Sequence, residues 1–171
     1  MNGVIVINKE EDFTSFDVVA VVRKTLGEKK VGHTGTLDPN ATGVLPVLLG
    51  SATKAQDIIV NHDKRYTASF QLGLQTDTLD IWGEVKKREK SDIKKQDIQA
   101  ILPEFVGEIT QIPPMYSAVK VNGVRLYDLA REGKEVERKE RKVRVYSVDL
   151  LDFDERTQTG TLDIFLSLIH I

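Results

Sequence analysis

Gly-His-Thr-Gly-Thr-Leu-Asp-Pro-Asn-Ala-Thr-Gly, residues Gly32–Gly43, is a stretch that neither a helix nor a regular strand accommodates well. Its three glycines, three threonines and one proline favour a tightly turned loop. The apolar run Val44–Leu49 follows directly and is expected to be buried, which would fix the loop to the core at its C-terminal side. A carboxylate such as Asp38 would then be held beside a substrate. The alternative is that Asp38-Pro39 is only a turn and that the glycines serve backbone geometry.

The segment before this loop predicts a strand followed by a helix. Val4–Ile7 is a β-branched run and predicts a buried strand. Thr14 is a candidate N-cap with Asp17 at capping-box spacing, and Gly27 is the expected C-terminal stop of the helix. The apolar face of this helix is expected to comprise Phe16, Val19, Val22 and Leu26.

The rest of the chain predicts mainly strands. Arg65–Leu74 alternates between apolar and polar residues and is the clearest strand pattern. Ser91–Phe105 predicts a helix, and Asn122-Gly123 is the signal of a hairpin turn. Val143–Leu151 and Thr161–Ile171 predict two further strands. The fold class is therefore α+β, with a mixed, mainly antiparallel sheet and flanking helices.

Composition limits the possible functions. The chain has 171 residues, enough for one domain with a large insertion. It contains no cysteine, which excludes disulfides and thiolate metal sites and fits a cytoplasmic location. No apolar run approaches the roughly 20 residues needed to cross a membrane, so no membrane partner is expected. The formal net charge of −2 argues mildly against nucleic-acid binding, but a basic strip within residues 134–144 can bind phosphates or be a solvated surface.

The segment Gly32–Pro46 closely resembles the signature of the bacterial tRNA pseudouridine synthases that modify uridine 55 in the T loop, the TruB-type family. The resemblance extends from Ile5 to about Leu166. It implies the pseudouridine synthase fold and an RNA-modifying isomerase whose partner is the T stem-loop of tRNA. We expect this enzyme to be monomeric. Because the reaction rearranges uracil on its ribose without net oxidation, no cofactor is expected. The chain also has no Walker motif, dinucleotide motif or metal-ligand cluster.

The resemblance implies a role for each residue of the site. Asp38 would be the nucleophile that acts on a flipped uridine. His33 would fill the stack that the base vacates, unless it is hydrogen-bonded within the loop. Tyr66 would stack on the target uracil, although by pattern alone it is a core or edge residue. Asp80 matches a family acid near the active site, or is a turn residue.

Other residues would contact the RNA. Lys9 is expected to bind substrate, in a loop where Glu10–Asp12 stand in place of the Pro and nearby Gly of the family. Lys64 and Arg65 precede Tyr66 and could reach phosphates. The segment from about residue 111 to 141 is expected to be a surface insertion that closes on the RNA, with backbone contacts from Arg138, Lys139 and Arg141.

The chain departs from the family at its C-terminal end. There the family continues into a Lys-Gly-Thr-Tyr-Ile-Arg segment, whose Arg pairs with the catalytic Asp, whereas here Asp163–Ser167 leads only to Leu168–Ile171. We therefore expect residues 1–171 to be a partial catalytic domain with a foreign tail and without the C-terminal RNA-binding domain. Such a chain would be weakly active or inactive.

Three alternatives remain open from the sequence. The chain could be a non-catalytic tRNA-binding or tRNA-folding module, and only the enzyme needs Asp38. It could be a guide-RNA-dependent relative, although the residue pattern of Thr34–Pro46 favours the stand-alone bacterial type. A hydrolase built on His33 and Asp38 is weaker, because no nucleophile-elbow sequence accompanies them.

Overall fold

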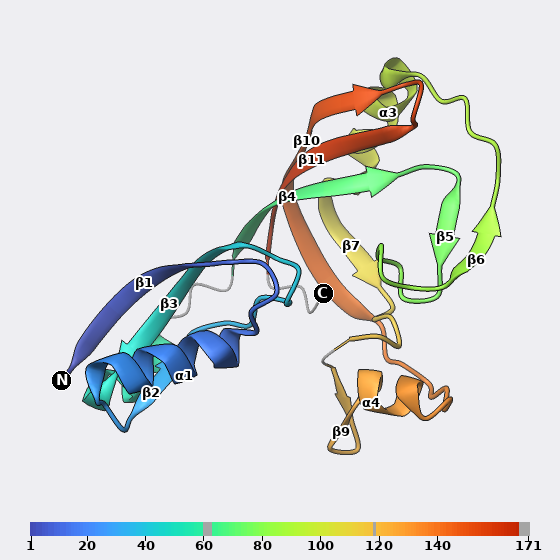
Figure 1. Ribbon diagram of the computed structural model, residues 1–171. Coiled ribbons are helices and arrows are strands. Elements are labelled where there is room, and N and C mark those ends of the chain that lie inside the picture. Colours follow the sequence, from blue (N-terminus) through green and yellow to red (C-terminus); the bar gives the residue numbers. More distant parts are fainter. Residues whose placement is uncertain (60–62, 118, 168–171) are drawn as a thin grey trace. The chain divides into compact units, whose positions relative to one another are not determined.

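The structure, a computed structural model, describes residues 1–59, 63–117 and 119–167 (Figure 1). The chain divides into two compact units, Met1–Asn61 and His62–Ile171. In the part of the chain that is described, no helix has the length and apolar character needed to cross a membrane.

The first unit is a three-stranded antiparallel sheet with one long helix. The strand order is β1 (Gly3–Lys9), β3 (Gly43–Leu49), β2 (Val31–His33), and α1 (Ser15–Leu26) lies between β1 and β2 in sequence. The 3-10 helix η1 (Gly50–Ala55) and the short α2 (Gln56–Ile59) follow β3. Buried residues of α1 and β3 form its core: Val18, Val22, Leu45, Val47 and Leu49.

The ends of α1 follow the sequence prediction. The Thr14 hydroxyl accepts a hydrogen bond from the Asp17 amide at 3.1 Å, and the Asp17 carboxylate accepts one from the Thr14 amide at 2.9 Å. Gly27 ends the helix in the left-handed region, with φ of 62°. The capping box and the glycine stop are thereby confirmed.

The predicted apolar face of α1 was partly wrong. Phe16 is 72% exposed and Leu26 is also exposed. The buried positions are Ser15, Val18, Val19 and Val22. The helix turns Ser15 inward to bond the loop backbone at Leu37, so the valines that follow at helical spacing face the sheet. The strand β1 is likewise not buried throughout, because its residues alternate and Val4 and Val6 are exposed.

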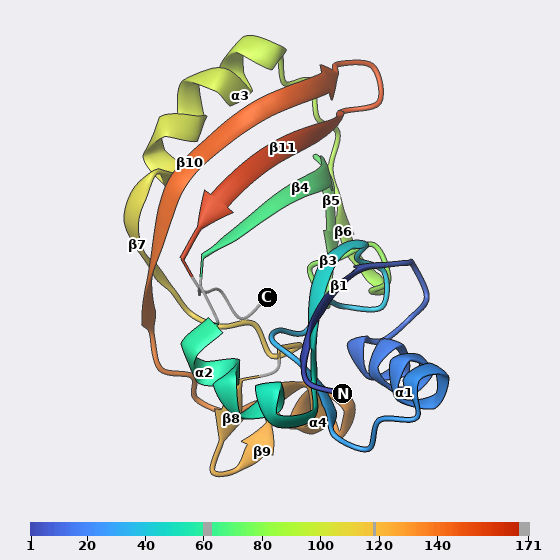
Figure 2. The ribbon, with the colours of Figure 1, turned by 90° about the vertical axis from the view of Figure 1, so that its left-hand side faces the viewer.

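The second unit is built on a four-stranded antiparallel sheet in the order β4 (Lys64–Gln71), β11 (Thr159–Leu166), β10 (Arg141–Asp154), β7 (Gly107–Gln111) (Figure 2). The helix α3 (Lys95–Ile101) and the 3-10 helix η2 (Leu102–Phe105) lie along β10. All strand pairs among the described residues are antiparallel, which confirms the mainly antiparallel α+β prediction. Residues 168–171 of the last predicted strand lie outside the described part.

The helix α3 begins at Lys95 rather than at the predicted Ser91, because a buried side chain holds the preceding residues. The carboxamide oxygen of Gln158 accepts hydrogen bonds from the Ser91 hydroxyl at 2.7 Å and from the Ile93 amide at 2.9 Å. Its nitrogen donates to the Ile93 carbonyl at 3.0 Å and to the Glu155 carbonyl at 2.7 Å. Gln158 therefore ties this segment to the turn between β10 and β11.

Two short hairpins complete the second unit. The first pairs β5 (Leu74–Thr76) with β6 (Val85–Arg88). The second pairs β8 (Lys120–Val121) with β9 (Val124–Arg125) and leads into α4 (Leu126–Arg131). Asn122 and Gly123 both have positive φ, 51° and 85°, as the predicted type of hairpin turn requires. Leu126 is fully buried and Val119 is 7% exposed, so part of the segment 111–141 is packed rather than open to solvent.

Candidate active site

The loop 34–42 of the first unit is held by the buried ammonium of Lys9. Lys9 lies at the end of β1 and is 0% exposed. Its Nζ donates three hydrogen bonds to main-chain carbonyls: to Glu10 at 2.8 Å, to Phe13 at 2.6 Å and to Pro39 at 3.1 Å. An ammonium has three donors, so all of them are occupied inside the protein. Lys9 was expected to bind substrate; in the structure its three donors are directed to the main chain of residues 10–13 and of the loop that carries Asp38.

The residues on both sides of Asp38 are fixed to the helical side of the unit. The Ser15 hydroxyl accepts a hydrogen bond from the Leu37 amide at 2.9 Å and donates one to the Leu37 carbonyl at 3.2 Å. The Asp12 amide donates to the Pro39 carbonyl at 2.9 Å. Asp12 has a φ of 65°, a left-handed conformation that glycine adopts without strain.

Asp38 itself is exposed. Its carbonyl accepts a hydrogen bond from the Ala41 amide at 3.0 Å, which closes a turn with Pro39 at its second position. The preceding Leu37 packs against the core. The turn interpretation and the catalytic interpretation are therefore compatible, because this turn holds an exposed carboxylate between two anchored neighbours.

His33 ends β2 and opens the loop. The Phe16 ring meets the His33 ring edge to face, with centroids 6.1 Å apart and planes at 82°. Its Nδ1 is buried and has no hydrogen-bond partner among the described residues. The Nδ1 atom therefore does not support the alternative that His33 is hydrogen-bonded within the loop.

In the second unit, Lys64, Arg65 and Tyr66 begin β4. Tyr66 lies opposite Ile164 of β11 and is half-buried. The Arg65 guanidinium binds Asp163 of β11 through two nitrogens, with Nη2 at 2.7 Å and Nε at 3.0 Å from Oδ2. These hydrogen bonds lower the pKa of Asp163 and raise the pKa of Arg65. The hydrogen bonds to Asp163 use Nε and Nη2, so a phosphate could be bound by the remaining N–H groups of the guanidinium or by displacement of the carboxylate.

Asp80 lies in the loop between β5 and β6. Its Oδ1 accepts hydrogen bonds from the Thr78 hydroxyl at 2.6 Å and from the Trp82 amide at 2.9 Å. Its carbonyl accepts one from the buried Thr76 hydroxyl at 2.7 Å. The turn role weighed for Asp80 is therefore present in the structure, and the residue is also exposed.

The basic residues of the segment 111–141 differ in their contacts. Arg138 donates to the Pro113 carbonyl at 3.3 Å and to Glu135 at 3.1 Å, so it holds the segment together. Lys139 and Arg141 are exposed. All three line a cavity of about 280 Å³ beside the hairpin β8–β9.

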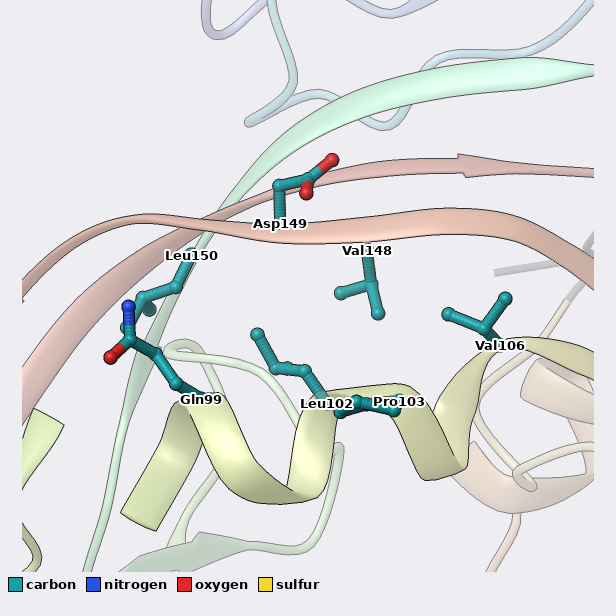
Figure 3. Close-up of a pocket in the computed structure, with 7 residues that line it drawn as sticks. All are labelled: Gln99, Leu102, Pro103, Val106, Val148, Asp149 and Leu150. Carbon is teal, nitrogen blue, oxygen red and sulfur yellow. The ribbon is translucent and has the colours of Figure 1, made fainter. Parts of the chain in front are cut away.

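The cavity along β10 contains none of the expected site residues. It measures about 580 Å³ and lies between β10 and the helices α3 and η2. Figure 3 shows Val148, Leu102 and Val106 pointing into it, whereas Asp149 points to the other side of the strand. Without converging polar groups, it is an imperfectly filled apolar interface rather than a catalytic pocket. Across the described ranges, no three His, Cys, Asp or Glu side chains gather as metal ligands.

Sequence reasoning missed Ser15 and the amide of Asp12 as parts of the site. Ser15 directly follows the helix cap and showed no distinguishing pattern, since its partner lies 22 positions away in the chain. The Asp12 amide is a main-chain group, and its role depends only on the left-handed conformation of that residue.

Comparison with known proteins identifies the family. The family described as "TruB family pseudouridylate synthase (N terminal domain)" matches residues 23–167. The chain belongs to this family.

The similar proteins are named as tRNA-modifying enzymes. The tRNA pseudouridine synthase B of Clostridium perfringens (strain SM101 / Type A) is 57% identical over 150 residues, which cover 87% of this chain and 51% of that protein. The protein of the same name from Dehalococcoides mccartyi is 52% identical over 154 residues, covering 90% and 51%. The chain thus spans about half the length of the curated relatives that it matches.

The fold is similar to that of chains in two solved complexes. A chain from the crystal structure of a Cbf5-Nop10-Gar1 complex has a TM-score of 0.73 and 30% identity, covering 99% of this chain and 40% of that chain. A chain from an H/ACA RNP bound to a substrate RNA containing 2'-deoxyuridine has a TM-score of 0.67 and 25% identity. The pseudouridine synthase fold predicted from the sequence is confirmed.

Proposed function

We propose that this chain carries the nucleophile of a tRNA pseudouridine synthase that converts uridine 55 of the T loop to pseudouridine. The observation that supports this most directly is the placement of Asp38. Asp38 is an exposed residue, while Leu37 and Pro39 on either side are bonded to Ser15, Asp12 and Lys9. An anchored turn keeps the carboxylate positioned, so substrate binding need not order it.

The proposed reaction is an isomerisation whose atoms balance within the substrate. The bond between N1 of uracil and C1′ of ribose breaks, and a bond between C5 and C1′ forms. The hydrogen on C5 leaves as a proton, and N1 gains one from solvent. The Asp38 carboxylate forms a transient covalent bond with either the base or the sugar, and its departure restores the free enzyme.

The target uridine must leave the stacked T loop before Asp38 can reach it. We propose that the His33 ring takes the vacated place and that Tyr66 stacks on the displaced uracil. The half-buried position of Tyr66 on β4 leaves part of its ring accessible. For Asp80, the hydrogen bonds from Thr78 and Trp82 support a role in shaping the loop beside the substrate.

Several cations are proposed to bind the RNA backbone. Lys64, Arg65, Lys139 and Arg141 would contact phosphates, and Arg65 would do so while Nε and Nη2 bind Asp163 or after that carboxylate is displaced. The segment 111–141 would close on the RNA, with Arg138 holding its shape. Such contacts make affinity fall as salt rises. Identities of 52–57% to proteins named tRNA pseudouridine synthase B favour tRNA over a guide-RNA-dependent substrate.

Release of tritium from a T-arm RNA labelled at C5 of uridine tests this function. Enzyme in excess over RNA makes even a slow single turnover visible. The wild-type chain is expected to release tritium, and Asp38→Asn is expected to release none while it still binds the RNA. Glu11→Gln makes the same carboxylate-to-amide change at another exposed position of the first unit and should leave release unchanged.

The results that contradict the proposal are specific. Normal release by Asp38→Asn would exclude this carboxylate as the nucleophile. RNA binding without release by the wild-type chain would favour the alternatives of a non-catalytic tRNA-binding or tRNA-folding module or an inactive fragment of such an enzyme.

A further inference from the structure

The loop that joins β5 to β6 presents three large apolar side chains to solvent. Leu79 is 67% exposed, Ile81 83% and Trp82 67%. They fall within four consecutive residues, and Asp80 is the only polar residue among them. Scattered apolar residues are ordinary on a protein surface, but a contiguous group marks an interaction surface. We call Leu79, Ile81 and Trp82 the apolar tip.

Hydrogen bonds hold the backbone of the apolar tip in one shape. The Asp80 carboxylate binds the Thr78 hydroxyl and the Trp82 amide. The Asp77 carboxylate accepts a hydrogen bond from the Glu84 amide at 2.8 Å, and the Asp77 amide donates to the Glu84 carbonyl at 3.1 Å. A side chain in place of Gly83 would collide with Thr78 and Asp77. The loop therefore holds the exposed indole on an ordered backbone, so little order has to be gained on binding.

The strand beside the apolar tip is cationic. Four of the five residues from Lys86 to Lys90 are basic, and all five are exposed. Lys86 pairs with Glu84 at 2.6 Å and Lys87 pairs with Glu89 at 2.7 Å, both on the surface. Exposed pairs of this kind are weak and can be exchanged for a phosphate. The carboxylates of Asp77 and Asp80, by contrast, are directed to backbone amides of the loop.

We propose that the β5–β6 hairpin is an RNA-binding element in which the Trp82 indole stacks on an unpaired nucleobase. An aromatic side chain next to a row of cations is the combination by which proteins bind unpaired nucleotides, with the ring on the base and the cations on the backbone. Leu79 and Ile81 flank the stacked base and exclude water from it. A protein partner would use the same apolar surface but would have no need of four cations within five residues. This inference rests on the proposed function in one respect, namely that the bound RNA is the T arm of tRNA.

The experiment uses the intrinsic fluorescence of Trp82, which is the single tryptophan of the chain. The wild-type chain is titrated with unlabelled T-arm RNA while tryptophan emission and its quenching by acrylamide are followed. Binding is measured independently by the anisotropy of a labelled RNA. Stacking predicts that saturating RNA lowers the emission and protects Trp82 from acrylamide.

Variants separate stacking from charge. Trp82→Ala is expected to weaken RNA binding about 5- to 150-fold, the loss that follows removal of one aromatic–base stack. Trp82→Phe should restore most of the affinity because it keeps an aromatic face. Val21→Ala removes an exposed apolar side chain from α1 and should change affinity less than twofold.

The outcomes distinguish this inference from the proposed function. Tritium release with unchanged Trp82 emission and acrylamide access would overturn the inference and leave the function standing. Protection of Trp82 by RNA in a chain that releases no tritium would support the contact and reject catalysis by residues 1–171. Weaker binding in Lys87→Gln or Arg88→Gln, but not in Trp82→Ala, would show a purely electrostatic contact and overturn stacking.

Discussion

Replacing Lys9 by methionine removes the ammonium that joins the two loops around Asp38 but keeps most of the length of the side chain. Three main-chain carbonyls, at Glu10, Phe13 and Pro39, lose a donor that is itself fully buried, and the Pro39 carbonyl keeps its hydrogen bond from the Asp12 amide. Leaving such groups unsatisfied is the main cost of the substitution. The methionine still fills the space of the methylene chain, so a cavity contributes little.

The magnitude follows from these contacts. Hydrogen bonds to a charged group contribute about 1.5–3 kcal/mol each, so three of them set an upper bound of about 9 kcal/mol. The ammonium was itself removed from water on folding, which offsets part of this sum. A buried carbonyl that loses its donor costs about 1–3 kcal/mol, and the Pro39 carbonyl keeps a second donor, so we expect Lys9→Met to destabilise the first unit by about 2–5 kcal/mol.

The assay compares urea unfolding of Lys9→Met and Lys24→Met by far-ultraviolet circular dichroism. Lys24 is exposed in the last turn of α1, and its replacement should cost no more than about 1 kcal/mol, the usual size of a helix-dipole contact. Amide exchange should accelerate at Asp12, whose hydrogen bond to Pro39 shares the carbonyl with Lys9. Ser15 still holds Leu37, so turnover below the unfolding transition should fall far less than in Asp38→Asn.

An unchanged free energy of unfolding in Lys9→Met would refute this reasoning. Together with an increased KM for RNA, that result would instead support the direct substrate contact expected from the sequence.

Three further predictions concern other anchors. Ser15→Ala should lower the free energy of unfolding by about 1–3 kcal/mol, because it leaves the Leu37 amide and carbonyl without their partner. Amide exchange at Leu37 should accelerate, and an unchanged exchange rate would exclude the contact. Gln158→Ala should destabilise the second unit by about 2–4 kcal/mol, since four hydrogen bonds are lost in a buried turn; a loss below 0.5 kcal/mol in urea unfolding followed by tryptophan emission would contradict this. Because the pKa of Asp163 is lowered in the folded state, its pairing with Arg65 stabilises the protein above the unfolded pKa of about 3.9 and is lost as pH falls through the folded pKa. Arg65→Gln should therefore make stability less dependent on pH below about 4. The same variant should reduce the salt dependence of RNA binding by about one unit of slope if Arg65 also binds a phosphate, and an unchanged slope would exclude that contact.

Local signals in the sequence predicted the ends of elements well. The Thr14–Asp17 capping box, the stop at Gly27 and the Asn122-Gly123 turn each depend on residues a few positions apart. Their chemistry is complete within one short segment, so no knowledge of the rest of the fold was needed. The same holds for the alternation that identified β4.

Features that depend on distant partners were not predictable. The burial of Lys9 requires a carbonyl 30 positions away, and the inward turn of Ser15 requires the loop at Leu37. The exposure of Phe16 follows from that inward turn, since hydrophobicity alone placed this ring in the core. The late start of α3 similarly depends on Gln158, which lies 65 positions from Ile93.

The use of main-chain acceptors by Lys9 has a consequence for which residues the neighbouring loop can carry. The Lys9 ammonium contacts no side chain through these three hydrogen bonds. Its acceptors are peptide oxygens, which almost any amino acid would supply in the same backbone conformation. This contact therefore does not fix the side chains at positions 10 and 13, whereas position 12, with a φ of 65°, favours residues that tolerate the left-handed conformation. The run of acids at Glu10–Asp12 is compatible with the loop shape that presents the carboxylate.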